Sequence, residues 1–290
     1  MQAEAHHMIM IGHRTVVFIA SALSALVMGF GSAGADSGDR IETSYEVNVG
    51  GLTVLDINYS SEITAAGYRS QASIETRGMA TFLSDYSMKM TAFGALAGGQ
   101  SSPVQYRSRR EKNNKEKTVD LNWSQGVLSV ADRQAAKNRE IQAEIDKALT
   151  PDVTDPLTAI LRIGTSQGEN PCTAAYRIFD GKEVFELRFR FKGEAVLDGN
   201  FPGAYQGRAY ECQASYVPIA GRYATKFNKR KDSPPTYAVW LAPIGTDASG
   251  EARLIPIRAT GRLDGFNFEA YASRVKVDGR PFKTVSATGN

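Results

Sequence analysis

Hydrophobic and polar residues alternate along most of the chain from Ile41 onward. The alternation is clearest in 184–192, where Phe185, Phe189 and Phe191 fall on one side and charged residues fall between them. A period of two is typical of a β-strand with one buried and one solvated face. The apolar side of this strand can contact a core, a bilayer or a ligand, and the rest of the sequence has to decide between them.

Similar runs recur at short intervals, and turn-forming residues separate them. Gly50-Gly51 and Asp180-Gly181 are two-residue hairpin signals, and Asn113-Asn114 and Gln125-Gly126 are expected hairpin tips. Strands are expected at 41–49, 52–63, 68–78, 79–93, 103–112, 117–124, 127–133, 173–179, 184–191, 209–223, 236–244, 252–263 and 265–277.

One region has a helical pattern instead. Residues 133–149 are rich in helix formers, and Thr150-Pro151 then interrupts them. Asp155 followed by Pro156 is an N-cap signal with proline in the first turn, which predicts a helix over 156–164. We predict a mainly β fold: an antiparallel curved sheet or barrel-like fold with a short helical insertion at about 133–163.

The N-terminal 35 residues have the features of a secretory signal peptide. Arg14 precedes an apolar run of about fifteen residues, and Ala33 and Ala35 fit the small positions of a cleavage site. The run is shorter than the roughly 20 residues of a membrane-spanning helix. We therefore expect cleavage between Ala35 and Asp36, a periplasmic location, and a single β-rich domain over 36–290.

Two cysteines, Cys172 and Cys212, lie in the exported part of the chain. In an oxidising compartment an even pair predicts a disulfide bond. The alternative, a redox pair, lacks a Cys-x-x-Cys motif. The sequence leaves open whether the bond forms within one chain or between two.

The charge and the missing residue types exclude several functions. A formal net charge of +3 is too small to indicate a nucleic-acid-binding protein. All three histidines, His6, His7 and His13, precede the expected cleavage site, which removes imidazole bases, Ser-His-Asp triads and histidine-bound metals from the exported chain. Phosphate-loop and dinucleotide motifs are absent as well. We therefore expect no cofactor and no metal.

Carboxylates alone could still support glycoside hydrolysis, but no pair stands out by its spacing. The candidates are Asp85, Asp120, Asp155, Glu183 and Glu186. Asp155 is better explained as a helix cap. Without a convincing catalytic group, we expect the protein not to be an enzyme.

Several blocks of the chain match one family pattern. They are Tyr45-x-Val47 with Gly51-Leu52, YRSQASIETRGMATFL, Pro103–Tyr106, TDPLTAILRI, PCTAAYRIFDGKE, YECQASYVPIAGR and IRATGRLDGFNFEAYASRVKVDG. Together they resemble one exported bacterial family, the domain of unknown function 3108, in its alphaproteobacterial form. The resemblance spans about 41–279, and its most specific parts contain the two cysteines. It implies a periplasmic β-rich protein and no established reaction.

Two functions remain open. In the first, a β cavity binds a hydrophobic ligand (a lipid, an acyl chain or an apolar peptide), and Phe185, Phe189 and Phe191 line the pocket. In the second, the protein has a solid core and supports the cell envelope through contacts with a partner protein. We expect no membrane-spanning strands, because segments such as 56–63 and 117–124 have poor apolar faces. The aromatic residues are expected in the core, among them Tyr45, Phe82, Trp240, Phe266 and Phe268.

Overall fold

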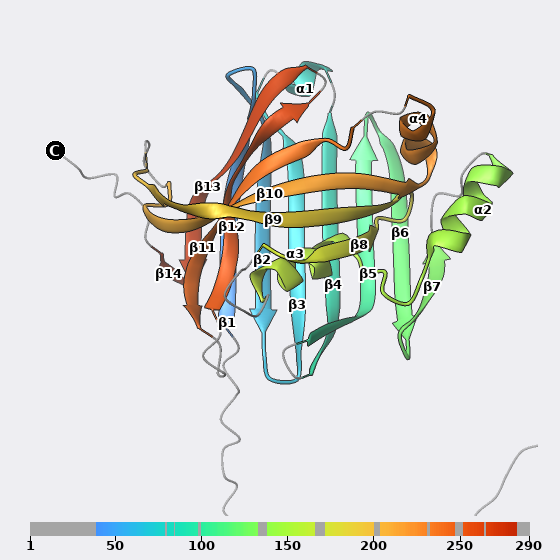
Figure 1. The fold of residues 1–290 in the computed structure, drawn as a ribbon, viewed down its shortest axis with the longest axis horizontal. Coiled ribbons are helices and arrows are strands. Elements are labelled where there is room, and N and C mark those ends of the chain that lie inside the picture. Colours follow the sequence, from blue (N-terminus) through green and yellow to red (C-terminus); the bar gives the residue numbers. More distant parts are fainter. Residues whose placement is uncertain are drawn as a thin grey trace, which may run out of the picture. The chain divides into compact units, whose positions relative to one another are not determined.

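In the part of the chain that the structure describes, fourteen strands form one sheet and four short helices accompany it (Figure 1). The computed structural model describes residues 39–282 except 79, 84, 98–99, 133–137, 166–171, 200–203, 231–232, 247–251 and 264. The expected signal peptide and its cleavage site at Ala35-Asp36 lie outside the described residues. The strands are β1 (Asp39–Val49), β2 (Leu52–Ile63), β3 (Gly67–Thr76), β4 (Tyr86–Ala97), β5 (Gln100–Lys112), β6 (Lys115–Ser124), β7 (Val127–Asp132), β8 (Ala175–Phe179), β9 (Val184–Leu197), β10 (Gly207–Ala220), β11 (Thr236–Thr246), β12 (Ala252–Leu263), β13 (Phe266–Val277) and β14 (Arg280–Pro281).

The sheet is an antiparallel meander that begins in its middle. The strands lie in the order β7-β6-β5-β4-β3-β2-β1-β13-β12-β11-β10-β9-β8, and β14 pairs with β13. Every pair of neighbours is also consecutive in sequence except β1 and β13, the first and one of the last strands. The sheet does not close, because β7 and β8 form its two edges. The predicted antiparallel curved sheet is therefore confirmed.

Several of the expected turns have the backbone that their sequences require. Asn113 and Asn114 have φ angles of +48° and +60°, and Gly50 and Gly51 have +58° and +86°. This left-handed region is the one that tight hairpins need and that asparagine and glycine adopt at least cost. The hairpin tips predicted at these positions are confirmed.

Four helices interrupt the strands: α1 (Ala80–Leu83), α2 (Arg139–Ala148), α3 (Pro156–Gly164) and α4 (Arg222–Arg230). The helix predicted over 156–164 is confirmed. Of the longer helix predicted over 133–149, the described part begins at Arg139, where Asn138 is the N-cap. The strand predicted over 79–93 was wrong in its first residues, because α1 occupies them and β4 starts at Tyr86.

The helix α3 fills the concave side of the curved sheet. It packs against β3, β4, β5, β8 and β12, and in Figure 1 the strands β9 and β10 cross β2–β6 with α3 near the crossing. The buried apolar residues of the protein form three clusters, and α3 contributes to each of them. Leu157 belongs to the first, Leu161 to the second and Ile163 to the third, and each is at most 6 % exposed. One helix thus holds both halves of the sheet together.

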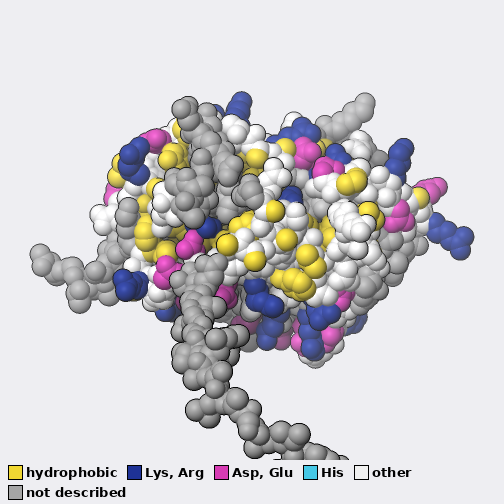
Figure 2. All heavy atoms as spheres, turned by 90° about the horizontal axis from the view of Figure 1, so that it is seen from below, with side chains coloured by type: hydrophobic (Ala, Val, Ile, Leu, Met, Phe, Trp, Pro, Cys, Tyr) yellow, Lys and Arg dark blue, Asp and Glu magenta, His cyan; other side chains and the backbone are white. Residues whose placement is uncertain are grey.

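The inner face of the sheet supplies the rest of the core. Tyr106, Leu121, Phe179 and Leu241 are completely buried. The prediction that Phe266 belongs to this core was wrong: it stands first in β13, beside the turn after β12, and is 62 % exposed. Figure 2 shows that the surface seen from below has hydrophobic side chains in its centre and many charged side chains around them.

Candidate functional site

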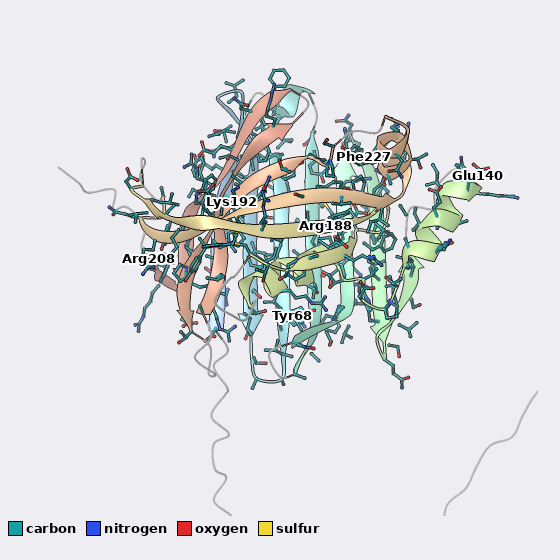
Figure 3. The ribbon with its side chains drawn as sticks, viewed as in Figure 1. Tyr68, Glu140, Arg188, Lys192, Arg208 and Phe227 are labelled. Atoms are coloured by element: carbon teal, nitrogen blue, oxygen red, sulfur yellow. A yellow bond between two sulfur atoms is a disulfide. The ribbon has the colours of Figure 1, made fainter. Side chains whose placement is uncertain are left out.

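The three phenylalanines of the predicted pocket share one face of β9, because odd-numbered residues of the strand point to the same side. Phe189 and Phe191 pack against the core cluster that contains both cysteines. Phe189 meets Tyr176 edge to face with ring centroids 6.1 Å apart, and Phe185 stacks on Tyr216 at 4.7 Å. All three rings are half-buried. These aromatic contacts are those of a packed face, and the outer face of the same strand carries Arg188 and Lys192 (Figure 3).

Little space remains around α3 itself. The hollow between this helix and strands β1, β2 and β12 has a volume of about 20 Å³, and Leu161 and Leu254 are among the residues that line it. That volume is about enough for one water molecule and far too small for an acyl chain. In this structure the helix occupies the place that a ligand of the concave face would need.

A disulfide bond between Cys172 and Cys212 joins β10 to the segment before β8 within one chain. Both residues are completely buried, and their Cα atoms are 5.7 Å apart. Ile163 of α3 and Leu241 of β11 belong to the same cluster. The bond therefore holds β10 and the start of β8 next to the C-terminal end of α3.

A network of hydrogen bonds links the Asp180-Gly181 turn to the start of α4. Asp180 Oδ1 accepts hydrogen bonds from the backbone N–H groups of Lys182 and Glu183, each at 2.8 Å. The Glu183 carboxylate, which is almost fully buried, then accepts from the N–H of Tyr223 in the first turn of α4, at 3.2 and 3.3 Å. Burial raises the pKa of Glu183, and the backbone bonds oppose this shift. The residue considered as a catalytic carboxylate thus serves as a helix cap.

Gly221 makes this cap possible, and its replacement by alanine is expected to lower the free energy of unfolding by about 2–4 kcal/mol. Its φ is +119°, and a Cβ atom there would come within 2.0 Å of Glu183 Oε2. Chemical denaturation measures the change. Gly279→Ala is the control, because Gly279 also has a positive φ but nothing within 4 Å of the added atom. An equal loss in both variants would show that only the backbone angle matters.

Asp155 caps α3 in the middle of the fold, as the sequence predicted. Its Oδ1 accepts from the N–H groups of Leu157 and Thr158 at 2.9 Å, and Thr158 Oγ1 donates to its Oδ2. The same Thr158 hydroxyl is 2.7 Å from the Tyr68 hydroxyl of β3. Burial raises the pKa values of Asp155 and Tyr68. This buried network ties the helix to the sheet.

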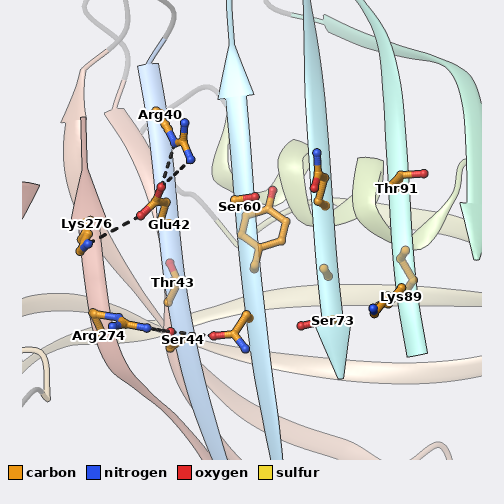
Figure 4. Close-up of a pocket in the computed structure, with 15 residues that line it drawn as sticks. Arg40, Glu42, Thr43, Ser44, Ser60, Ser73, Lys89, Thr91, Arg274 and Lys276 are labelled. Carbon is orange, nitrogen blue, oxygen red and sulfur yellow. Dashed lines mark hydrogen bonds and ion pairs between the residues drawn. The ribbon is translucent and has the colours of Figure 1, made fainter. Parts of the chain in front are cut away.

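A hollow with many polar lining residues lies on the opposite, outer face of the sheet, over β13, β1, β2, β3 and β4 (Figure 4). It has a volume of about 490 Å³. We call it the outer groove; its polar lining on this face is Arg40, Glu42, Ser44, Asn58, Ser60, Gln71, Ser73, Lys89, Thr91, Arg274 and Lys276.

The strand register arranges most of these side chains in two neighbouring rows across the sheet. One row runs Arg274, Ser44, Asn58, Ser73 and Lys89, each residue opposite the next on adjacent strands. The second row, two residues further along each strand, runs Lys276, Glu42, Ser60, Gln71 and Thr91. Hydroxyl and amide side chains of β1–β4 therefore form the floor, and the basic side chains of β13 and of Lys89 on β4 stand at its two sides.

Positive charge exceeds negative charge in the outer groove. Its lining contains four cationic side chains and one carboxylate, Glu42. Arg40 Nε donates to Glu42 Oε1 at 2.8 Å, and Lys276 Nζ lies 4.0 Å from Glu42 Oε2. Arg274 donates to Ser44 Oγ at 2.9 Å, and Lys89 has no ion-pair partner within the described residues. The groove is thus suited to an anion.

The sequence alone does not reveal this site. The two segments in which basic residues stand close together in the chain, 108–117 and 226–232, do not line the groove. The first forms the β5–β6 hairpin and the second contains the end of α4. The basic residues of the outer groove come from three strands, β1, β4 and β13, so only the register shown above brings them together.

The fold and the groove define a class: an antiparallel, mainly β protein whose open curved sheet wraps a central helix. The family model described as Protein of unknown function (DUF3108) matches residues 44–260, about three quarters of the chain. The chain belongs to this family, which confirms the family resemblance. None of the curated proteins compared with it matches.

One solved structure that resembles the chain is the beta-barrel-like protein of the domain of unknown function DUF1849 from Brucella abortus. The two sequences are 12 % identical, the TM-score is 0.45, and the match covers 83 % of this chain and 98 % of that one.

Within the described residues, none of the helices has the length and hydrophobicity of a membrane-spanning segment. No group of three or more His, Cys, Asp or Glu side chains is arranged there to hold a metal ion.

Proposed function

We propose that the protein is an exported, non-catalytic binding protein that acts through the outside of its sheet. The observation that carries the proposal is the position of α3: its buried residues Leu157, Leu161 and Ile163 fill the concave side, and about 20 Å³ remains beside them. A protein with a filled interior and a polar, cationic groove on its outer face is built to hold a partner or ligand at that face. Such a role fits support of the cell envelope from the periplasm.

The non-catalytic part of the proposal has its own support. Two of the carboxylates considered for catalysis already accept hydrogen bonds from helix groups. Asp155 accepts from two backbone N–H groups and from the Thr158 hydroxyl, and Glu183 accepts from the N–H of Tyr223. Asp120 is paired with Arg107 at 2.6 Å on the outer face. A general acid or base needs a free oxygen within hydrogen-bond reach of a substrate, and these three are already engaged.

The competing function is the binding of a hydrophobic ligand on the concave side of the sheet. It would require α3 to move away from that side. That movement would expose its apolar stripe and break the hydrogen bond between the Thr158 hydroxyl of α3 and the Tyr68 hydroxyl of β3. The half-buried rings of Phe185, Phe189 and Phe191 would then become available to an acyl chain. The geometry therefore favours binding at the outer surface over binding in an internal cavity.

Native mass spectrometry of the chain exported by a Gram-negative host tests the choice. We expect the mass of residues 36–290 with one disulfide bond and no apolar molecule bound. The control is the same protein incubated with a fatty acid and then desalted, which should leave the mass unchanged. A copurifying lipid or acyl chain in stoichiometric amount would contradict the proposal, and so would retention of the first 35 residues.

A further inference from the structure

We propose that the outer groove binds an acidic oligosaccharide: an extended chain of hydroxylated rings that carries carboxylate or phosphate groups. The inference rests on the proposed function, because it names the ligand of a surface that holds a molecule without transforming it. Three features carry it: the chemistry of the floor, the position of the cations, and the recessed shape.

The floor consists of groups that both donate and accept hydrogen bonds. Ser44, Ser60, Ser73 and Thr91 present hydroxyls, and Asn58 and Gln71 present amides. Sugar hydroxyls also donate and accept, so a floor of this kind can match them without leaving a group unpaired. Part of the network is already oriented, because Arg274 donates to Ser44 Oγ and Ser44 Oγ donates to Asn58 Oδ1, both at 2.9 Å.

The cations stand on the two sides of this floor. Arg274 and Lys276 lie on β13 and Lys89 lies on β4, and β1, β2 and β3 separate them. Four strand spacings amount to about 19 Å. On the next strand, Arg109 lies opposite Lys89 and Arg107 lies opposite Thr91. These two arginines are already paired with Glu116 and Asp120, so the ligand's charges must meet the cations of β13 and β4. A ligand that spans the groove must therefore be extended and must carry negative groups some distance apart.

The recessed shape argues against other anions. Serine side chains are much shorter than the arginine and lysine side chains beside them, so the floor lies below its borders. A bilayer or a nucleic-acid duplex is too broad to reach such a floor. Single-stranded nucleic acid is held by stacking of bases on aromatic rings, and Tyr59, the aromatic residue of the lining, is 8 % exposed. A peptide strand binds a sheet at its edge and not on its face.

Glu42 is the carboxylate within this cationic lining, and it gives the sharpest test. It engages Arg40 and lies 4.0 Å from Lys276, so it competes with an anionic ligand for both. Glu42→Gln keeps the size of the side chain and removes this competition. An electrostatic site should bind an acidic ligand more tightly after the change, whereas damage to the fold could only weaken binding.

The experiment is isothermal titration of the exported chain with a galacturonate tetramer, with the neutral maltotetraose as the matched probe. We expect the acidic sugar to bind and the neutral one to bind at least tenfold more weakly. Lys89→Gln and Arg274→Gln should each weaken binding of the acidic sugar about three- to tenfold, and Glu42→Gln should tighten it about threefold. Lys115→Gln, on the exposed β5–β6 hairpin outside the groove, should leave it unchanged. Thermal unfolding of every variant verifies that the fold is kept.

Several results would overturn the inference: no binding of the acidic tetramer, equal affinity for the neutral one, or equal loss in Lys115→Gln. Tighter binding to vesicles containing anionic phospholipid, or to oligoglutamate, would assign the groove to a lipid head group or an acidic peptide and would also overturn it. None of these results touches the proposed function, which fails on a bound apolar molecule in the native mass spectrum. The two claims can therefore fail separately.

Discussion

Replacing Cys172 and Cys212 together by alanine is expected to lower the free energy of unfolding by about 4 kcal/mol. The bond closes a loop with a sequence separation of 40 residues, and loss of that closure frees the unfolded chain by about this amount. For a domain of this size the melting temperature should fall by about 10 °C. Differential scanning calorimetry under oxidising conditions measures the change.

The control is the same comparison after full reduction. Reduced wild-type protein and the alanine variant should then melt within a few degrees of each other, since both lack the covalent link. The remaining difference reports the packing of the two sulfur atoms against Ile163 and Leu241. A large difference that persists after reduction would mean that packing, and not loop closure, is the main contribution.

Asp155→Ala is expected to cost about 2–4 kcal/mol of unfolding free energy. The change removes the N-cap of α3 and leaves the N–H groups of Leu157 and Thr158 unpaired in the interior. Asp155→Asn is the matched variant, because asparagine caps helices nearly as well as aspartate. Urea denaturation should rank the proteins as wild type and Asn close together and Ala far below. If Ala and Asn lost the same amount, the carboxylate and not the cap would matter.

The pH dependence of the same pair follows from the pKa of Asp155. Burial raises that pKa above its ordinary value of 3.8, although hydrogen bonds from Thr158 and Leu157 oppose the shift. The folded protein therefore holds the proton more tightly than the unfolded chain. The stability from this group is fully present below pH 3.8 and is lost as the pH rises through the folded pKa. Relative to Asp155→Asn, the wild type should lose stability as the pH rises through this window; a gain would show that the hydrogen bonds outweigh burial.

Much of the fold could be predicted because local chemistry determines it. The strand at 52–63 and the helix at 156–164 were placed to the residue, since a glycine pair precedes the one and an Asp-Pro cap begins the other. The start of β4 was misplaced, because the apolar residues of 79–83 fit a strand and a short helix equally well. Alternation cannot separate the two over so short a segment.

The interior and the groove lay beyond the reach of the sequence. The alternation in β9 identified Phe185, Phe189 and Phe191 as one face, but a periodic pattern does not reveal whether the opposing surface is empty. Only the place of α3 answers that question. Likewise, Arg274 and Lys89 become members of one row through four strand registers, and each register depends on a turn and on bulges that the sequence specifies only in part.

The pairing of β1 with β13 also has a kinetic consequence. Ser44 and Arg274 are neighbours in the sheet although 230 residues separate them in sequence, whereas the other neighbours on the main path of the sheet are consecutive strands. The consecutive hairpins can form one after another along the chain. The second side of β1, in contrast, stays unpaired until β13, near the end of the chain, joins it. Joining these ends is the most costly loop closure in the molecule. The two halves are therefore expected to collapse early, and their union at this seam to limit the rate of folding.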